Sequence, residues 1–218
     1  MTLPALVVFD LAGTTIEDRG QVPAAFTAAL AAHGIVATAE QITRVRGASK
    51  RQAIRAFVAS DAEASRVYAA FQLALAARFE ADRVNPIPGA AECFQALRHA
   101  GARVALTTGF DRDITNLLIA ALSWQDVADT IVCGDDVAQG RPAPDLILRA
   151  MAETGVTRPT TVATVGDTTL DLEAGAAAGV GWNIGVLSGA HGRDALARSP
   201  HTHLVQSVAA LPELWRPA

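Results

Sequence analysis

Short apolar runs recur along the chain, and longer stretches whose apolar residues follow a helical spacing separate them. Short runs rich in β-branched residues and bounded by turn residues are typical of strands buried in a parallel sheet. Runs of this kind occupy residues 5–9, 103–106, 130–133, 161–165, 181–186 and, more weakly, 203–205. Because these runs alternate with helical patterns, the sequence predicts an α/β fold with a doubly wound parallel sheet and helices on both faces.

The region from residue 17 to residue 85 breaks this alternation. It contains no convincing strand pattern. Its apolar residues recur at every fourth position in Val67, Phe71, Leu75 and Phe79. That spacing is typical of a helix facing a core, and the Pro- and Gly-rich stretch 85–89 then ends the region. We therefore expect a small helical cap domain over residues 17–85, inserted into a core domain formed by residues 1–16 and 86–218.

The composition narrows the class of protein. The chain has 218 residues, of which 50% are hydrophobic and 18% charged, which is enough apolar material for a sizeable core. Its net charge of -4 gives no electrostatic attraction for nucleic acid, and no apolar run is long enough to span a bilayer. Cys93 and Cys133 have unrelated spacing, which favours neither a zinc site nor a disulfide framework. We expect a cytoplasmic protein that binds neither nucleic acid nor membrane.

Four elements with groups suited to phosphoryl transfer stand near the ends of predicted strands. Asp10 follows the first run, Thr107 follows the second, and Asp167 and Asp171 follow the fourth, while Arg141 brings a cation from a Gly-Arg-Pro stretch. Ligands of open α/β sheets bind beyond the carboxyl ends of the strands, so these residues are expected to converge. A carboxylate such as Asp10 can attack phosphorus. The other two carboxylates can join it in holding a hard cation such as Mg²⁺.

Neighbouring positions add groups that can bind phosphoryl oxygens. Gly13 forms a turn beside Asp10, and Thr108 and Gly109 follow Thr107 at the start of a predicted helix. Backbone N–H groups and a hydroxyl at a helix N-terminus are a common binding site for phosphate. A guanidinium such as that of Arg141 binds phosphoryl oxygens by charge-assisted hydrogen bonds. We therefore expect a small-molecule phosphate or phosphonate as the substrate.

The order and spacing of these motifs resemble the haloacid dehalogenase superfamily. Its signature elements are matched by Asp10, Thr107, Arg141 and the pair Asp167 and Asp171. The resemblance covers nearly the whole chain. It implies a Mg²⁺-dependent hydrolase with a Rossmann-like core, in which Asp10 becomes an aspartyl phosphate. Because relatives form dimers, the resemblance also implies a homodimer as a candidate assembly.

The residue at position 12 narrows the resemblance to the phosphonatase branch. Ala12, within Asp-Leu-Ala-Gly-Thr-Thr, replaces the second aspartate with which most of these phosphatases protonate a leaving oxygen. When a P–C bond breaks, the electrons go to carbon, and a lysine Schiff base lets them flow into an enamine. Such a leaving group needs no proton on oxygen. The resemblance implies that Ala12 instead offers its backbone carbonyl to Mg²⁺, together with Asp10, Asp167 and Asp171.

The predicted cap supplies a lysine for this chemistry. Lys50 matches, by its distance from Gly47, the Schiff-base lysine of the phosphonatase cap. The cations Arg46, Arg51 and Arg55 surround it in the sequence, and neighbouring cations lower the pKa of an amine. Arg51 is also a candidate substrate-binding residue. The expected reaction is hydrolysis of the P–C bond of phosphonoacetaldehyde or a related β-carbonyl phosphonate.

The predicted pocket departs from the phosphonatase pattern, which leaves alternatives open. Ala53 stands where the branch carries histidine and Arg46 where it carries methionine, while Gln21 and Phe110 replace a cysteine and a tyrosine. One alternative is a phosphatase that acts on a small phosphate ester, with Lys50 at a helix start that only binds an anion. Another is a binding module without turnover.

Overall fold

Six parallel strands form the centre of the protein within residues 2–215, which are the residues that the computed structural model describes. The strands are β1 (Leu6–Asp10), β2 (Arg103–Thr107), β3 (Thr130–Val132), β4 (Val162–Gly166), β5 (Trp182–Val186) and β6 (His203–Val205). Their order is β3-β2-β1-β4-β5-β6, and every neighbouring pair is parallel. The predicted doubly wound sheet is confirmed, with strand ends that differ from the predicted runs by one residue at most. Residues 1 and 216–218 of the predicted core lie outside the described range.

The strand order reverses at β1, which places the candidate site. β1 pairs with β2 on one side and with β4 on the other, so all three strands end at the same edge of the sheet. Asp10 stands in register with Thr107 at this edge. Every residue of β1 is buried, as expected for a central strand with apolar residues on both faces.

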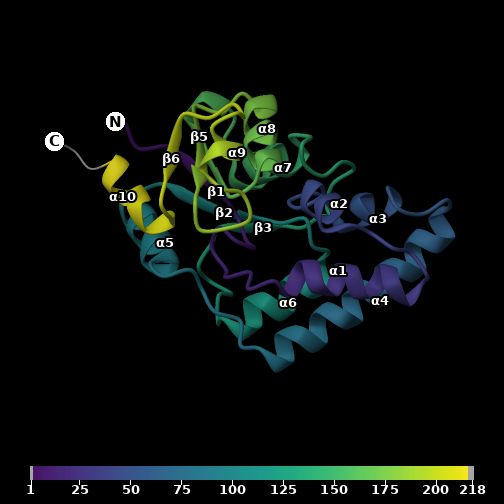
Figure 1. The fold of residues 1–218 in the computed structure, drawn as a ribbon. Coiled ribbons are helices and arrows are strands. Elements are labelled where there is room, and N and C mark those ends of the chain that lie inside the picture. Colours follow the sequence, from purple (N-terminus) through teal and green to yellow (C-terminus); the bar gives the residue numbers. More distant parts are fainter. Residues whose placement is uncertain (1, 216–218) are drawn as a thin grey trace.

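Helices cover the two faces of the sheet (Figure 1). One face packs against α5 (Ala90–His99) and α6 (Arg112–Ala121) through Phe9, Phe94 and Leu118. The other face packs against α7 (Asp145–Thr154) and α8 (Thr169–Ala178) through a smaller apolar cluster. The remaining short helices are η1 (Pro159–Thr161), α9 (Arg193–Leu196), η2 (Val208–Ala210) and α10 (Leu211–Leu214). No described helix is both long enough and apolar enough to cross a bilayer.

Residues 17–85, called the helical segment below, carry four helices and, within this described stretch, no strand. The helices are α1 (Gln21–Ala32), α2 (Ala39–Arg44), α3 (Lys50–Arg55) and α4 (Asp61–Ala81). They lie together beside the carboxyl edge of the sheet (Figure 1). α1 packs on α4, and the rings of Phe26 and Phe71 meet edge to face with centroids 5.9 Å apart. The predicted stripe on α4 faces this contact, with Val67, Phe71 and Leu75 buried.

Candidate active site

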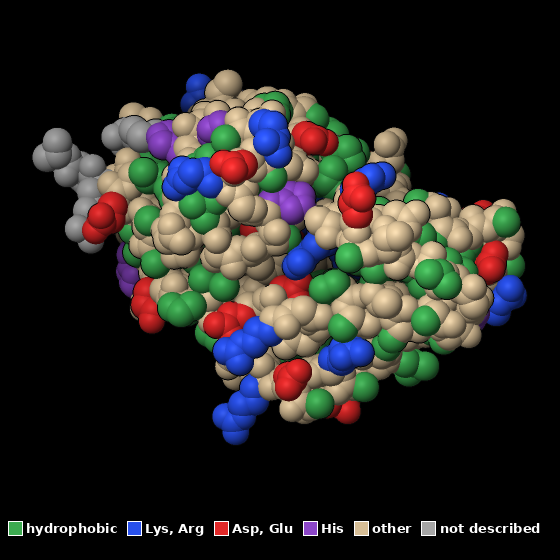
Figure 2. Space-filling view, viewed as in Figure 1, with side chains coloured by type: hydrophobic (Ala, Val, Ile, Leu, Met, Phe, Trp, Pro, Cys, Tyr) green, Lys and Arg blue, Asp and Glu red, His purple; other side chains and the backbone are tan. Residues whose placement is uncertain are grey.

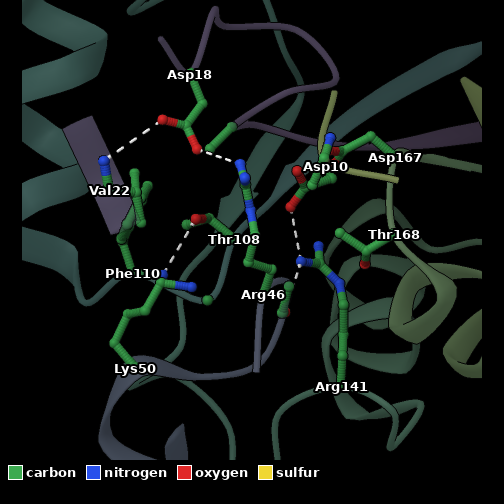
Figure 3. A pocket seen from close by; sticks show the side chains of 14 residues that line it. Asp10, Asp18, Val22, Arg46, Lys50, Thr108, Phe110, Arg141, Asp167 and Thr168 are labelled. Atoms are coloured by element: carbon green, nitrogen blue, oxygen red, sulfur yellow. Dashed lines mark hydrogen bonds and ion pairs between the residues drawn. The ribbon is translucent and has the colours of Figure 1, made fainter. Parts of the chain in front are cut away.

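A small cavity lies at the carboxyl ends of β1, β2 and β4, where the helical segment meets the sheet (Figure 3). It has a volume of about 30 Å³. Asp10, Ala12 and Asp167 line it from the sheet, and Arg46 and Lys50 line it from the helical segment. In the space-filling view, basic and acidic side chains meet in the crease between these two parts (Figure 2). The structure therefore brings the predicted nucleophile and the predicted lysine into one cavity.

Arg141 is the buried cation that holds Asp10. Its Nη1 donates to Oδ1 of Asp10 over 2.6 Å, and its Nη2 donates to the Thr107 hydroxyl over 2.8 Å. Its Nε lies 2.9 Å from Oδ1 of Asp171. Burial raises the pKa of the Asp10 carboxyl above its usual range, although the Arg141 guanidinium opposes that shift. The predicted residues Asp10, Thr107 and Arg141 thus form one hydrogen-bonded cluster.

Asp171 stands behind Arg141 and does not line the cavity. Its Oδ1 faces Arg141, and its Oδ2 accepts from the backbone N–H and the hydroxyl of Thr168 at the start of α8. Both carboxylate oxygens are therefore engaged by this capping box and by Arg141. The sequence analysis grouped Asp171 with the metal ligands, whereas its position here supports Arg141 and the helix start.

Asp167 lies across the cavity from Arg141 and is held by the loops around it. Its Oδ1 accepts from the Thr14 hydroxyl over 3.1 Å, and its Oδ2 accepts from the Ala190 backbone N–H over 2.6 Å. A Cβ atom on Gly13 would lie 2.3 Å from Oδ2 of Asp167, so this turn requires glycine. Burial and the charges of Asp10 and Asp171 raise the pKa of Asp167.

The acidic groups of the cavity fit a hard cation. Among the described residues, no three His, Cys, Asp or Glu side chains gather closely enough to hold a metal ion by themselves. Two carboxylates, those of Asp10 and Asp167, do face the same cavity beside the Ala12 backbone. Burial raises both pKa values, the Asp171 charge adds to the shift of Asp10, and the charges of Asp10 and Asp171 add to that of Asp167. A divalent cation between Asp10 and Asp167 would favour their ionised forms. Two carboxylates and a carbonyl leave further ligand positions for water or a substrate oxygen.

Lys50 begins α3 and points into the cavity from the side opposite the nucleophile loop. Its backbone N–H donates to the Gly109 carbonyl over 3.1 Å, which ties α3 to the end of β2. Its Nζ donates to the Ala48 carbonyl over 3.0 Å and lies 5.3 Å from the centre of the Phe110 ring. Burial lowers the pKa of Lys50 to about 8, while the Asp10 charge opposes that shift and the Arg141 charge adds to it. Lys50 is also the only lysine in the chain, which the sequence analysis overlooked.

The cause expected for the lowered pKa of Lys50 needs correction. The sequence analysis attributed it to Arg46, Arg51 and Arg55, but burial is the largest cause. Arg51 is bound to Asp111 over 2.8 Å, and Arg55 lies 3.0 Å from Asp61, so both charges are paired outside the cavity. The Arg46 charge does lower the pKa of Lys50, although burial and the Arg141 charge lower it more.

Three predicted substrate-binding residues have roles that the sequence did not reveal. The Arg51 guanidinium lies over the Tyr68 ring at 4.2 Å and does not line the cavity. The Gly13 backbone N–H donates to the Ile16 carbonyl, so it is not available to a phosphoryl group. Gly109 lets the chain approach Ala48, since a Cβ there would lie 2.4 Å from the Ala48 carbonyl oxygen. Gly109 nevertheless lines the cavity, and so does Thr108, whose hydroxyl accepts from the Phe110 N–H.

Two further contacts at the cavity escaped the sequence analysis. Asp18 binds Arg46 across the cavity. Its position ahead of α1 is a recognisable capping signal, and its Oδ1 accepts from the N–H groups of Gly20 and Val22. The Ala190 N–H is a backbone donor, and nothing in the side-chain pattern marks it.

The arrangement of Asp10, Thr107, Arg141 and Asp167 can be compared with known proteins. The profile of the haloacid dehalogenase-like hydrolases matches residues 7–183. The chain belongs to this family. A phosphonoacetaldehyde hydrolase of Paraburkholderia xenovorans is 32% identical over 201 residues, which cover 83% of this chain and 73% of that protein.

Two solved structures share the fold of this chain. A hydrolase from Pseudomonas syringae superposes with a TM-score of 0.87 at 25% identity, over 96% of this chain and 97% of its own. A phosphonoacetaldehyde hydrolase like protein from Oleispira antarctica superposes with a TM-score of 0.84 at 24% identity, over 98% and 91% of the two chains. The family profile and the 32% identical relative show that the chain is a hydrolase of the haloacid dehalogenase superfamily.

Proposed function

We propose that this hydrolase cleaves the P–C bond of phosphonoacetaldehyde or a related β-carbonyl phosphonate, with Lys50 as a Schiff-base residue. The observation that carries the proposal is that the only lysine of the chain is buried in the same cavity as Asp10. The other side chains that carry a permanent positive charge are all arginines, and a guanidinium does not form an imine with a carbonyl. Covalent chemistry best explains why the one lysine side chain of this sequence lies in this cavity. The name of the 32% identical relative supports the same reaction.

Lys50 would act first, by attack on the substrate carbonyl. The reaction needs the free amine, and a pKa lowered to about 8 leaves an appreciable fraction of free amine near neutral pH. The nitrogen adds to the carbonyl carbon, and loss of water gives a protonated imine two bonds from phosphorus. Because Lys50 is 7% exposed, bulk water would have little access to this imine.

Asp10 would then take the phosphoryl group. Among the described residues, Oδ2 of Asp10 has no hydrogen-bond donor, whereas Oδ1 is held by Arg141. A bond forms between a carboxylate oxygen and phosphorus, and the C–P bond breaks with its electron pair passing into an enamine. Protonation of the enamine carbon and hydrolysis of the imine release the carbonyl product, and water cleaves the aspartyl phosphate. Arg141 and Thr107 balance the charge on the phosphoryl oxygens.

The residues of the cavity support a Mg²⁺ site formed by Asp10, Asp167 and the Ala12 carbonyl. When bound, Mg²⁺ supplies positive charge that screens the anionic nucleophile from the anionic phosphoryl group. Asp171 would support this arrangement through Arg141, as its contact with Nε indicates. With a methyl group at position 12, the cavity has no acid at this position to protonate a leaving oxygen.

The helical segment would serve as a cap that opens for the substrate. It supplies Lys50 and Arg46 to the cavity, while the nucleophile and Arg141 belong to the sheet-bearing part. Because the two parts contribute opposite walls of this cavity, their separation would widen the entrance for a substrate. Domain closure of this kind excludes water and completes a catalytic site.

A second candidate function is hydrolysis of a small phosphate ester. The Nζ of Lys50 donates to the Ala48 carbonyl, and this arrangement also suits an ammonium group that binds an anion. In that reaction Lys50 would bind the distal end of the substrate, and another group would protonate the leaving oxygen. Activity would then survive Lys50→Ala better than Asp10→Asn.

Reductive trapping tests the proposal directly. Borohydride added with phosphonoacetaldehyde should leave a reduced adduct on a peptide containing Lys50, and Lys50→Arg should abolish both the adduct and phosphate release. Because Lys50 is the only lysine, the amino terminus is the only other primary amine to exclude. Phosphate release from phosphonoacetaldehyde without any adduct would overturn the Schiff base. Faster release of phosphate from phosphate esters than from phosphonoacetaldehyde would favour the second candidate function.

A further inference from the structure

Arg46 is the one cation of the cavity that the proposed chemistry does not use. It lies in the loop between α2 and α3, and its side chain extends across the cavity toward Asp18 (Figure 3). Its Nη2 lies 2.5 Å from Oδ2 of Asp18, and its side chain is 24% exposed. Asp10, Lys50 and Arg46 line the same cavity. The guanidinium therefore stands within the space that the substrate must occupy.

The Asp18 carboxylate fixes the position of Arg46 but binds only one nitrogen of its guanidinium. Oδ1 of Asp18 accepts from the Gly20 and Val22 N–H groups at the start of α1, so this side chain is anchored on the other side. Asp18 is also almost fully buried, with a side-chain exposure of 4%. Among the described residues, no acceptor binds Nε or Nη1 of Arg46. An arginine held at one nitrogen and open at the others is preorganised to bind an anion.

The ligand of these free donors has to be a part of the substrate other than the phosphoryl group. Arg141 and the proposed Mg²⁺ site hold the phosphoryl end at Asp10. The aldehyde end of phosphonoacetaldehyde is neutral and offers the guanidinium no charge. A carboxylate on the carbonyl carbon would offer a negative charge. It would lie one bond from the atom that Lys50 attacks, on the side away from the phosphoryl group. Its planar shape also matches the arginine fork.

We propose that Arg46 is a specificity-determining residue and that the substrate is a β-carbonyl phosphonate with a carboxylate on its carbonyl carbon, a 2-oxo-3-phosphono acid. This inference rests on the proposed P–C cleavage. The same bonds form and break as in the reaction of phosphonoacetaldehyde. Lys50 forms the imine at the oxo carbon, the C–P electrons enter the enamine, and protonation and hydrolysis release a 2-oxo acid and phosphate. Arg46 binds the carboxylate through all of these steps and forms no covalent bond.

A comparison of 3-phosphonopyruvate with phosphonoacetaldehyde tests the inference. The wild-type enzyme should have the higher kcat/KM for 3-phosphonopyruvate. Arg46→Met should lower that value by about 10- to 100-fold, the range expected for lost hydrogen bonds to a charged group. Turnover of phosphonoacetaldehyde should fall much less, because its neutral aldehyde end offers Arg46 no charge, and this value also reports on folding. Arg44→Met, in an exposed pair with Glu40 on α2, is the matched control and should change neither value.

Each alternative outcome has a distinct meaning. Equal losses on both substrates in Arg46→Met would show that Arg46 only holds the helical segment to Asp18, and would overturn the inference. A wild-type preference for phosphonoacetaldehyde, with Arg46→Met silent, would overturn it while leaving P–C cleavage intact. If neither phosphonate releases phosphate, the proposed function fails. Calorimetry with Asp10→Asn protein then decides the inference, which stands only if 3-phosphonopyruvate binds and Arg46→Lys weakens that binding about tenfold.

Discussion

Arg141 and Asp10 form a buried ion pair of 2.6 Å, and both side chains are more than nine-tenths buried. The same guanidinium reaches Asp171 through Nε and Thr107 through Nη2, so three elements of the sheet edge converge on one cation. Burial of a charge is tolerated when it is paired and hydrogen-bonded in this way. Arg141 therefore fixes the direction in which the nucleophile faces the cavity.

Replacement of Arg141 by lysine should impair catalysis more than folding. An ammonium keeps the charge but cannot make the three contacts of the guanidinium at fixed geometry. We expect kcat to fall by about 100-fold, which is typical for loss of one preorganised donor in an active site. Steady-state release of phosphate measures this loss. Arg149→Lys, at an exposed pair with Glu153, is the control and should leave kcat unchanged.

Restoring an acid at position 12 should change the preferred leaving group. Ala12 lines the cavity beside Asp10, where a carboxyl group could protonate a leaving oxygen. A positioned general acid contributes about 10²- to 10⁴-fold, so Ala12→Asp should gain hydrolysis of alkyl phosphate esters by a factor in this range. P–C hydrolysis should not gain, because its leaving atom is carbon. Ala12→Ser, which adds no acid, serves as the control, and an equal gain with serine would contradict this account of Ala12.

The sequence predicted the residues of the site that follow buried strands. Asp10 and Thr107 end consecutive apolar runs, and parallel strands bring such ends together, so their convergence follows from the pattern. The positions of Asp171 and Arg51 did not follow. A carboxylate three residues after Thr168 can cap its own helix or face a metal, and an arginine beside Lys50 can point either way around α3. The choice depends on Arg141 and Asp111, which lie far away in the sequence.

Two further contacts at the cavity could not be predicted from the sequence, each for its own reason. The Ala190 N–H holds Asp167, and the Asp18 carboxylate binds Arg46 in the loop after α2. The first depends only on how the loop after β5 is folded, so no side-chain type indicates it. The second joins the start of the helical segment to its middle, and a charge pair over this separation has no periodic signal.

Formation of the Schiff base should become faster as the pH rises toward 8. Lys50 carries a proton below its pKa, and only the free amine above it attacks a carbonyl. Burial lowers that pKa from 10.5 to about 8, so the rate should rise about tenfold per pH unit below 8 and level off above it. Reductive trapping at a fixed, short time over pH 6 to 10 measures the free-amine fraction. A rate that still climbs above about pH 10 would show that Lys50 is titrating as an exposed lysine does.

Gly13→Ala should weaken the site for magnesium as well as the fold. Gly13 has φ +93°, and a Cβ atom there would lie 2.3 Å from Oδ2 of Asp167. Backbone strain of this kind costs about 1–2 kcal/mol, and the clash would push the Asp167 carboxylate from its place beside Asp10. Gly34→Ala isolates the strain, since Gly34 has φ +72° and open space around it. Thermal unfolding should show both variants destabilised, whereas Mg²⁺ titration by calorimetry should show reduced affinity in Gly13→Ala only. Equal Mg²⁺ affinity in the two variants would remove Asp167 from the proposed metal ligands.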